Sequence, residues 1–199
     1  MADLKQNQTY KDITDTSFKL GASLPSRFSG IPKAVSSAGQ QPQQPRQPRQ
    51  PQQYSGQSGA ELLKGFQTTV PYGGSTRYEG FHSGSDLVSR QGTKAPIPSF
   101  TPGTVVESRT GQGKTKKPSF GNYVLIKTPD GKFVRYSHLS ENYVQVGSDI
   151  SIGQPVGTQG ATGSVYSLHG GSGEHLDLRI YEIYQNQKKY YDPFKYLST

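Results

Sequence analysis

Residues 173–180 have the sequence Gly-Glu-His-Leu-Asp-Leu-Arg-Ile, in which polar and apolar residues alternate. A period of two is typical of a β-strand that packs one face on a core. The side chains of His175, Asp177 and Arg179 then project from one face, and those of the residues between them from the other. An imidazole and a carboxylate two positions apart can reach one metal ion or one substrate. In isolation, a half-buried strand with a solvated polar face is the simpler interpretation.

The sequence from residue 77 onward consists of short β-prone segments separated by glycine and proline, without a long helical pattern. The strongest hairpin signal is the turn sequence at residues 128–131, Thr-Pro-Asp-Gly, which separates two strand-like segments. These features predict an all-β domain of hairpins and small mixed sheets over residues 61–199. Short strands are expected at residues 104–107, 122–127, 132–136, 143–147, 150–152, 155–157 and 173–180, a short helix at 60–66, and a connector at 67–75.

Residues 1–60 differ in composition and predict an extended, irregular N-terminal arm. In the Gln/Pro-rich segment 40–53 a proline recurs at every third position, which matches the three-residue turn of polyproline II. This segment cannot form a core, so we expect a semi-rigid spacer, with a ligand for a proline-binding module as the alternative. Scattered apolar residues such as Phe18, Phe28 and Ile31 are expected to anchor the arm on partner proteins.

Composition excludes several kinds of protein. The chain has no cysteine, so disulfides and thiolate metal sites are impossible. It has no apolar run of about 18 residues, and therefore no membrane span is expected. The net charge of +8 is divided evenly between the arm and the domain, and no basic helix or aromatic stacking motif indicates sequence-specific nucleic-acid binding. The first residues lack the layout of a secretory signal peptide.

All four histidines, at positions 82, 138, 169 and 175, lie in the predicted domain. Any one of them is most simply a structural histidine. Together with Asp86 and Asp177, however, they form a set of imidazoles and carboxylates in short segments flanked by glycine. A catalytic zinc ion takes three nitrogen or oxygen ligands and keeps one position open. The set can supply these ligands and leave histidines over for proton transfer.

Several blocks of sequence occur in an order that resembles one known family. They are His82-x-x-x-Asp86, Pro102-Gly103-Thr104-Val105-Val106, Gly121-Asn122-Tyr123-Val124, Tyr136-Ser137-His138-Leu139-Ser140, the glycine-punctuated residues 147–163, His175-Leu176-Asp177 and the closing segment 192–197. In this order, residues 80–197 resemble the lysostaphin/LytM-type zinc metallopeptidases, which cleave peptide cross-links of bacterial peptidoglycan. The resemblance covers most of the predicted domain.

The resemblance implies a role for each residue of the set. His82 and Asp86 correspond to metal ligands of the family, and His138 and His175 correspond to its catalytic histidines. Asp177 stands where the family has the second histidine of a His-x-His motif, which is its third ligand. We therefore expect Asp177 to point at the same spot as His82 and Asp86, and the implied cofactor is Zn²⁺. His169 matches no ligand of the family and is expected in a loop near the cleft.

The aspartate at position 177 departs from the family pattern, and two consequences for the metal site are considered. A carboxylate binds zinc at about 2.0–2.2 Å, so the site is not necessarily abolished. A second negative charge makes the bound metal less effective in acidifying water, which favours a slower hydrolase or a harder metal. The alternative is a degenerate, non-catalytic module.

These observations predict a metal-dependent peptidoglycan hydrolase carried on a phage tail. A virion protein is assembled in the cytoplasm and reaches the cell wall with the particle, so it needs no signal peptide. The expected partners are peptidoglycan and, through the arm, other virion or tail proteins. Two alternatives remain open: a structural module of the tail that binds cell wall or partner proteins without hydrolysis, and an envelope regulator that activates other wall hydrolases.

Overall fold

The computed structural model describes residues 56–111, 119–167 and 171–199. Most of the predicted arm, including the Gln/Pro-rich segment, lies outside the described residues, as does His169. The predictions made for them stay predictions.

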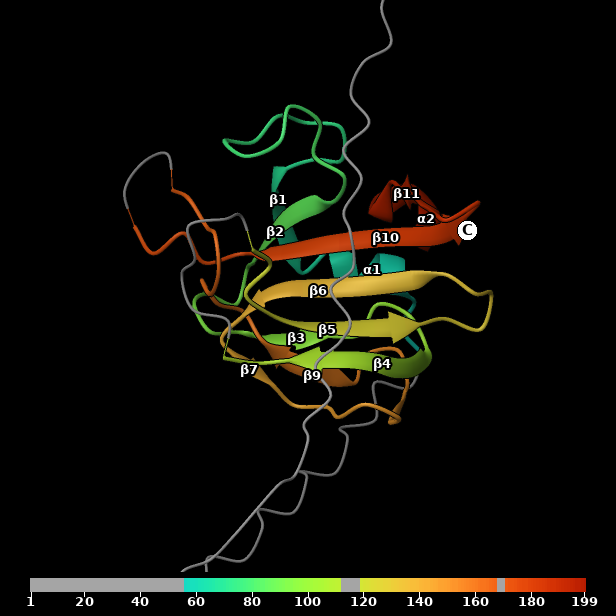
Figure 1. Cartoon of the computed structure of the whole chain (residues 1–199). Helices are drawn as coiled ribbons and strands as arrows, with labels where there is room; N and C mark the ends of the chain where they lie inside the picture. Colours follow the sequence, from blue (N-terminus) through green and yellow to red (C-terminus); the bar gives the residue numbers. More distant parts are fainter. Residues whose placement is uncertain (1–55, 112–118, 168–170) are drawn as a thin grey trace, which may run out of the picture. The chain divides into compact units, whose positions relative to one another are not determined.

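The described residues form an all-β domain, as the sequence predicts, with two short helices (Figure 1). Eight strands join one antiparallel sheet in the order β1-β2-β10-β6-β5-β4-β8, with β11 paired to β10. These strands are β1 (Phe66–Val70), β2 (Ser85–Ser89), β4 (Gly103–Arg109), β5 (Asn122–Lys127), β6 (Phe133–Leu139), β8 (Asp149–Ile150), β10 (Leu176–Tyr184) and β11 (Gln187–Tyr191). A second sheet holds β3 (Pro96–Pro98), β9 (Pro155–Thr158) and β7 (Glu141–Asn142), and the helices are α1 (Gly59–Leu63) and α2 (Pro193–Leu197).

Strand β10 lies between β2 and β6 and carries the alternation that the sequence predicts. Leu176, Leu178 and Ile180 are completely buried on its inner face. They belong to a single apolar cluster that includes Ile97 of β3 and Val156 of β9. The small sheet and α1 lie behind the main sheet in Figure 1, so the core fills the space between these layers. The outer face carries the polar residues of β10, Asp177 and Arg179, followed by Tyr181, which stacks on Phe133 of β6.

The hairpin between β5 and β6 confirms the turn predicted at residues 128–131. The two strands pair in antiparallel register, from Ile126 opposite Val134 to Lys127 opposite Phe133. Gly131 has a φ of 84°, a left-handed conformation that glycine adopts without steric cost. This hairpin places the end of β6, and with it His138, at the edge of the sheet where β10 begins.

Two predicted elements are wrong. The expected connector at residues 67–75 contains β1, which pairs with β2. Beyond Phe66 the side chains of β1 are mostly exposed, so an edge strand of this kind shows no apolar alternation. The expected strand at 143–147 is absent, because Tyr143 N–H donates to Val156 and Gly147 N–H to Val105, and no ladder forms with a single neighbour. Neither helix in the described residues has the length and apolar character needed to cross a membrane.

Candidate metal centre and catalytic groove

Asp86 and Asp177 lie directly opposite each other on neighbouring antiparallel strands. Asp86 is on β2 and pairs in register with Asp177 of β10, which pairs on its other side with Ser137 of β6. Opposed residues of an antiparallel pair project to the same face of the sheet. The two carboxylates therefore lie side by side on the outer face, and Asp177 is almost completely buried.

His82 approaches these carboxylates from the loop that precedes β2. Its backbone N–H donates to Gly74 and its carbonyl accepts from Gly73, so the loop fixes the residue from both sides. His82 is 2% exposed. Its Nε2 atom lies 3.0 Å from Oδ1 of Asp86 and 3.8 Å from Oδ1 of Asp177. His82 and Asp177 are far apart in sequence, and the fold brings them into contact.

These three residues fit the requirements of a zinc site. One ligand atom from each lies within 4.8 Å of the others. A tetrahedral zinc ion with bonds of about 2.0–2.2 Å holds its ligand atoms roughly 3.4 Å apart, close to the observed separations. Nε2 of His82 and Oδ1 of Asp86 are buried and face each other as an ion pair at 3.0 Å, and within the described residues neither atom has a well-aligned hydrogen bond. Buried polar atoms without a well-aligned hydrogen bond are costly, and a metal ion between these two would coordinate both.

Carboxylates surround the imidazole of His82 and stabilise its charged form. Burial acts in the opposite direction, but Asp86 and Glu79 raise the pKa of His82 to about 9. Burial likewise opposes the charge of Glu79, yet contacts with His82 and Arg179 lower the pKa of this carboxyl to about 2. Without metal, His82 is therefore a cation at neutral pH, and a metal ion must displace the proton on Nε2.

His138 lies at the end of β6, in the same groove as the three ligand residues, with an unusual φ of 64°. Its Nδ1 lies 2.8 Å from the carbonyl oxygen of Thr162. A carbonyl can only accept, so Nδ1 carries the proton and Nε2 is the basic nitrogen of the neutral ring. Burial lowers the pKa of His138 to about 4, and the neighbouring His175 acts in the same direction. His138 is consequently a neutral base at pH 7.

His175 precedes β10 and is held by a bridge to Gly160, whose carbonyl accepts from the His175 N–H. Its Nδ1 donates to the carbonyl of Gly173 over 2.8 Å. Nε2 is directed toward the carboxylates and lies 3.7 Å from Oδ1 of Asp86. The rings of His138 and His175 are 4.8 Å apart between centroids. Both imidazoles are therefore in the same tautomer, with the proton on Nδ1.

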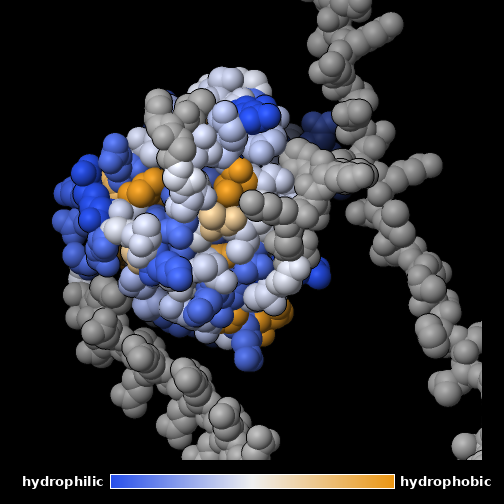
Figure 2. Space-filling model, turned by 90° about the vertical axis from the view of Figure 1, so that its left-hand side faces the viewer, coloured by the Kyte–Doolittle hydropathy of each residue, from blue (hydrophilic) through white to orange (hydrophobic). Residues whose placement is uncertain are grey.

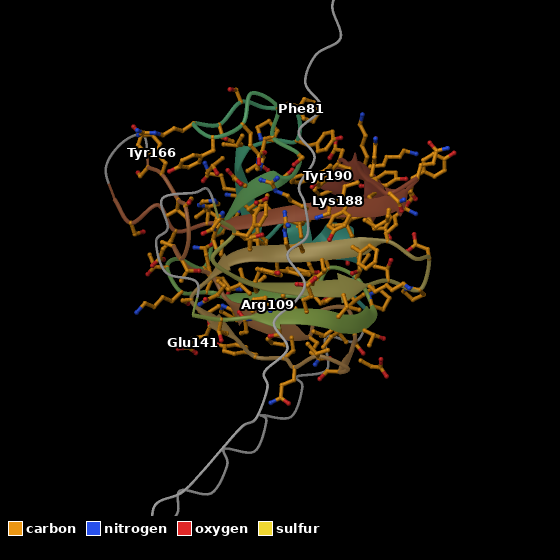
Figure 3. The ribbon with its side chains drawn as sticks, viewed as in Figure 1. Phe81, Arg109, Glu141, Tyr166, Lys188 and Tyr190 are labelled. Carbon is orange, nitrogen blue, oxygen red and sulfur yellow. The ribbon has the colours of Figure 1, made fainter. Side chains whose placement is uncertain are left out.

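All five residues predicted from the sequence line one groove of about 1150 Å³. Its walls are formed by β1, the loop at residues 75–79 and the residues at 164–167 and 171–174. Figure 2 shows the face at the left of Figure 1, and this face is largely hydrophilic with small apolar spots. Tyr166 projects at the left-hand end of the domain in Figure 3 and is 47% exposed. The guanidinium of Arg77 stacks on its ring at 4.5 Å, which joins two walls of the groove.

The sequence profile of Peptidase family M23 matches residues 80–193, more than half of the chain. The chain belongs to peptidase family M23. This is the family of the LytM and lysostaphin type, and the matched residues include His82, Asp86, His138, His175 and Asp177.

Known members of family M23 are similar to this chain in sequence and in fold. The peptidoglycan DD-endopeptidase ShyA of Vibrio cholerae is 36% identical over 88 residues, which are 44% of this chain and 19% of ShyA. The catalytic domain of lysostaphin from Staphylococcus simulans superimposes with a TM-score of 0.56 at 26% identity, over 70% of this chain and 98% of that domain. A variant of the catalytic domain of the prophage-encoded M23 protein EnpA of Enterococcus faecalis superimposes with a TM-score of 0.51 at 27% identity, over 64% of this chain and 88% of that domain. The chain spans 12–22% of the length of the curated relatives it matches.

Three contacts at the site involve residues outside the five predicted site residues. Glu79 bonds to Nδ1 of His82, Arg179 bonds to Asp177, and Thr162 holds His138. The alternation of β10 places Arg179 on the polar face, so this residue was identifiable as a neighbour of Asp177. Glu79 and Thr162 belong to loops, and no local pattern indicates where a loop residue meets the site.

We predict that Gly121→Ala disturbs His138 without removing the metal ligands. Gly121 has a φ of 62°, and an added Cβ would collide with the carbonyl group of Thr162, which accepts the bond from His138. We expect hydrolysis to fall at least about tenfold at unchanged zinc content, because the base loses its orientation. The matched control is Gly131→Ala, with a φ of 84° and no atom within 4 Å of the added Cβ. The Gly131→Ala substitution should lower the free energy of unfolding by about 1–2 kcal/mol and leave turnover unchanged.

Steady-state kinetics, metal analysis and thermal unfolding of both glycine variants check this prediction. Equal turnover in the two variants would show that the contact between residues 121 and 162 does not orient the base.

Proposed function

We propose that this chain is a metal-dependent endopeptidase that hydrolyses peptide cross-links of peptidoglycan. The observation that carries the proposal is the convergence of three ligand side chains and two histidines in one groove. His82, Asp86 and Asp177 present one ligand atom each, within 4.8 Å of one another. Asp86 also lies 3.7 Å from Nε2 of His175, which connects the ligand set to the histidine pair.

His82, Asp86 and Asp177 would hold the zinc ion, which when bound supplies a Lewis acid that activates water and polarises a carbonyl group. The residues of the chain provide proton transfer and orientation. His138 is neutral at pH 7 and can accept a proton at Nε2 while Nδ1 stays bonded to Thr162. His175, held in the same tautomer by Gly173, can bind a proton at Nε2 and stabilise a developing negative charge on the substrate.

The named relatives support the choice of substrate. ShyA is a peptidoglycan DD-endopeptidase and lysostaphin is an antimicrobial peptidase, and their names describe hydrolysis of peptide bonds. The hydrophilic groove, open along the outer face of the sheet, suits an extended and polar peptide. We therefore assign peptidoglycan peptides, rather than apolar polypeptides, to this groove.

We further propose that the protein is part of a phage virion, on the tail, where it acts at the bacterial cell wall. Two observations support this location: the Gln/Pro-rich composition of residues 40–53 suits a spacer between a particle and an enzyme, and the similar protein EnpA is prophage-encoded. Mass spectrometry of gradient-purified particles from the source culture tests it. Recovery of the chain only in the particle-free fraction would contradict the virion location.

Digestion of purified peptidoglycan by the full chain tests the enzymatic proposal. We expect stoichiometric zinc, release of muropeptides identified by mass spectrometry, loss of release with a chelator, and recovery when zinc is added back. The companion variant is Asp177→His, which restores the motif of the family. If the wild-type chain binds no zinc and releases nothing while Asp177→His does both, the wild-type protein is a non-catalytic module and the enzymatic proposal is wrong.

A further inference from the structure

Arg179 makes the most extensive polar contacts of any residue beside the candidate metal centre. It lies on β10, two positions after Asp177 on the same face, and is 6% exposed. Its Nε donates to both carboxylate oxygens of Asp177, at 3.0 and 2.8 Å. Nη2 lies 2.8 Å from Oε1 of Glu79, and Nη1 donates to the hydroxyl of Ser83. All three nitrogens of the guanidinium are therefore engaged.

These contacts connect Arg179 to two of the three ligand residues. Asp177 is bound directly, and its Oδ1 atom remains directed toward Nε2 of His82. His82 is reached through Glu79, whose second oxygen lies 3.3 Å from Nδ1 of the imidazole. A partner that holds the far side of a metal ligand fixes its orientation, and in metalloproteins such partners tune metal affinity. A single cation thus fixes a carboxylate ligand and the residue that orients the imidazole ligand.

Gly84 provides independent evidence that this arrangement is built into the fold. A Cβ atom at position 84 would lie 2.5 Å from Cγ of Arg179, and 2.7 Å from both Oδ1 of Asp177 and the carbonyl oxygen of Leu178. Any larger residue would therefore displace the ion pair or its neighbours. Gly84 has no left-handed backbone conformation that would otherwise demand glycine. The space that its missing side chain leaves is filled by Arg179 and Asp177.

The negative charge that Asp177 adds to the metal centre is offset by the positive charge of Arg179. A histidine in place of Asp177 would be a neutral ligand, whereas the aspartate adds a negative charge beside Asp86 at the bottom of a buried site. Two adjacent carboxylates repel each other, and a neighbouring guanidinium offsets this repulsion. Because an Arg–carboxylate pair also has a fixed planar geometry, the same contact orients the carboxylate.

We propose that Arg179 is a positioning residue that enables an aspartate to act as the third metal ligand. It does so by orienting Oδ1 of Asp177 toward the metal and by offsetting the negative charge of the Asp177 carboxylate. This inference rests on the proposed function, since it assumes that the centre holds a metal ion. It makes position 179 dependent on position 177: the arginine matters most when the third ligand is a carboxylate. When that ligand is an imidazole, the arginine keeps only its indirect contact with His82, through Glu79.

A double-mutant cycle on zinc affinity tests this dependence. The dissociation constant for zinc is measured by competition with a chromogenic chelator, on the full chain, for wild type, Arg179→Gln, Asp177→His and the double variant. We expect Arg179→Gln to weaken zinc binding by about 10–100-fold in the wild-type background and by about threefold or less in the Asp177→His background. A merely structural role of Arg179 would weaken binding equally in both backgrounds, and that result would overturn the proposal.

Arg135→Gln is the matched control. Arg135 lies directly opposite Arg179 on β6 and is similarly buried, at 5% exposure. It stacks on the ring of Phe120 at 3.4 Å, and within the described residues its Nε and Nη2 have no hydrogen-bond partner. Removing its charge should change zinc affinity by about threefold or less, because it does not hold a ligand. A loss as large as that of Arg179→Gln would show a general charge effect and contradict the positioning role.

If the Arg179→Gln variant fails to fold, as judged by thermal unfolding, the Gly84→Ala variant is used in its place. Its added Cβ collides with Arg179, with Asp177 and with the carbonyl oxygen of Leu178 while every charged group is kept, and the same selective loss of zinc affinity is expected. The wild-type measurement separates the two proposals. If the wild-type chain neither binds zinc nor digests peptidoglycan, both proposals are wrong, whereas tight binding and digestion without coupling between positions 177 and 179 overturn only the role of Arg179.

Discussion

Replacing His82 by alanine is expected to abolish both zinc binding and hydrolysis, whereas replacing His138 by alanine is expected to abolish hydrolysis alone. His82 supplies the only nitrogen of the ligand set, and without it two carboxylates face an open space beside Glu79. His138 is not among the ligand residues and bonds instead to Thr162. Loss of a general base lowers turnover by about 10²–10⁴-fold.

Metal analysis and muropeptide release, measured on the same preparations, check this pair of variants. Thermal unfolding shows whether each variant is folded, and added zinc should raise the unfolding temperature of His138→Ala but not of His82→Ala. If His138→Ala loses its zinc as well, His138 is a ligand. If it keeps both zinc and wild-type turnover, the assignment of His138 as the base is wrong.

Replacing Leu178 by alanine is expected to cost about 2–5 kcal/mol of the free energy of unfolding. Leu178 is completely buried and pairs in register with Ser85 of β2 and Tyr136 of β6. Its removal leaves a cavity directly beneath the residues of β10 that face the metal centre. Because domains are stable by only about 5–15 kcal/mol, this loss is a large part of the total.

Urea unfolding of Leu178→Ala and of Ile183→Ala measures this cost against a control on the same strand. Ile183 also belongs to β10 but is 52% exposed, so its truncation should change stability by no more than about 0.5 kcal/mol. Similar unfolding midpoints for the two variants would mean that the inner face of β10 does not support the sheet.

Local sequence determined which residues of each element face the core and which face the groove. The alternation around Asp177 is a property of a strand alone, since successive side chains point to opposite sides. It therefore assigns Leu178 to the core and Arg179 to the polar face before any partner strand is known. The Thr-Pro-Asp-Gly turn likewise specifies the hairpin that carries His138, because its backbone preferences are local.

Other parts of the fold left no local signal. Strand β1 is an edge strand with mostly exposed side chains, and its identity depends on its hydrogen bonds to β2. Residues 143–147 are apolar enough to suggest a strand, but their backbone groups bond to separate neighbours. Propensity describes a residue's conformation, whereas a ladder requires a partner of matching length and direction.

The metal centre itself was decided by the tertiary structure. The sequence supplies His82, Asp86, His138, His175 and Asp177, but only the register of β2 against β10 sets Asp86 opposite Asp177. Only the packing of two loops selects the tautomers of the imidazoles and the contact of Glu79 with His82. The hydrogen bonds from Arg179 to Asp177 also need the space left by Gly84. Such contacts join residues distant in the chain, so they depend on strand pairing and close packing, which no local pattern of residues encodes.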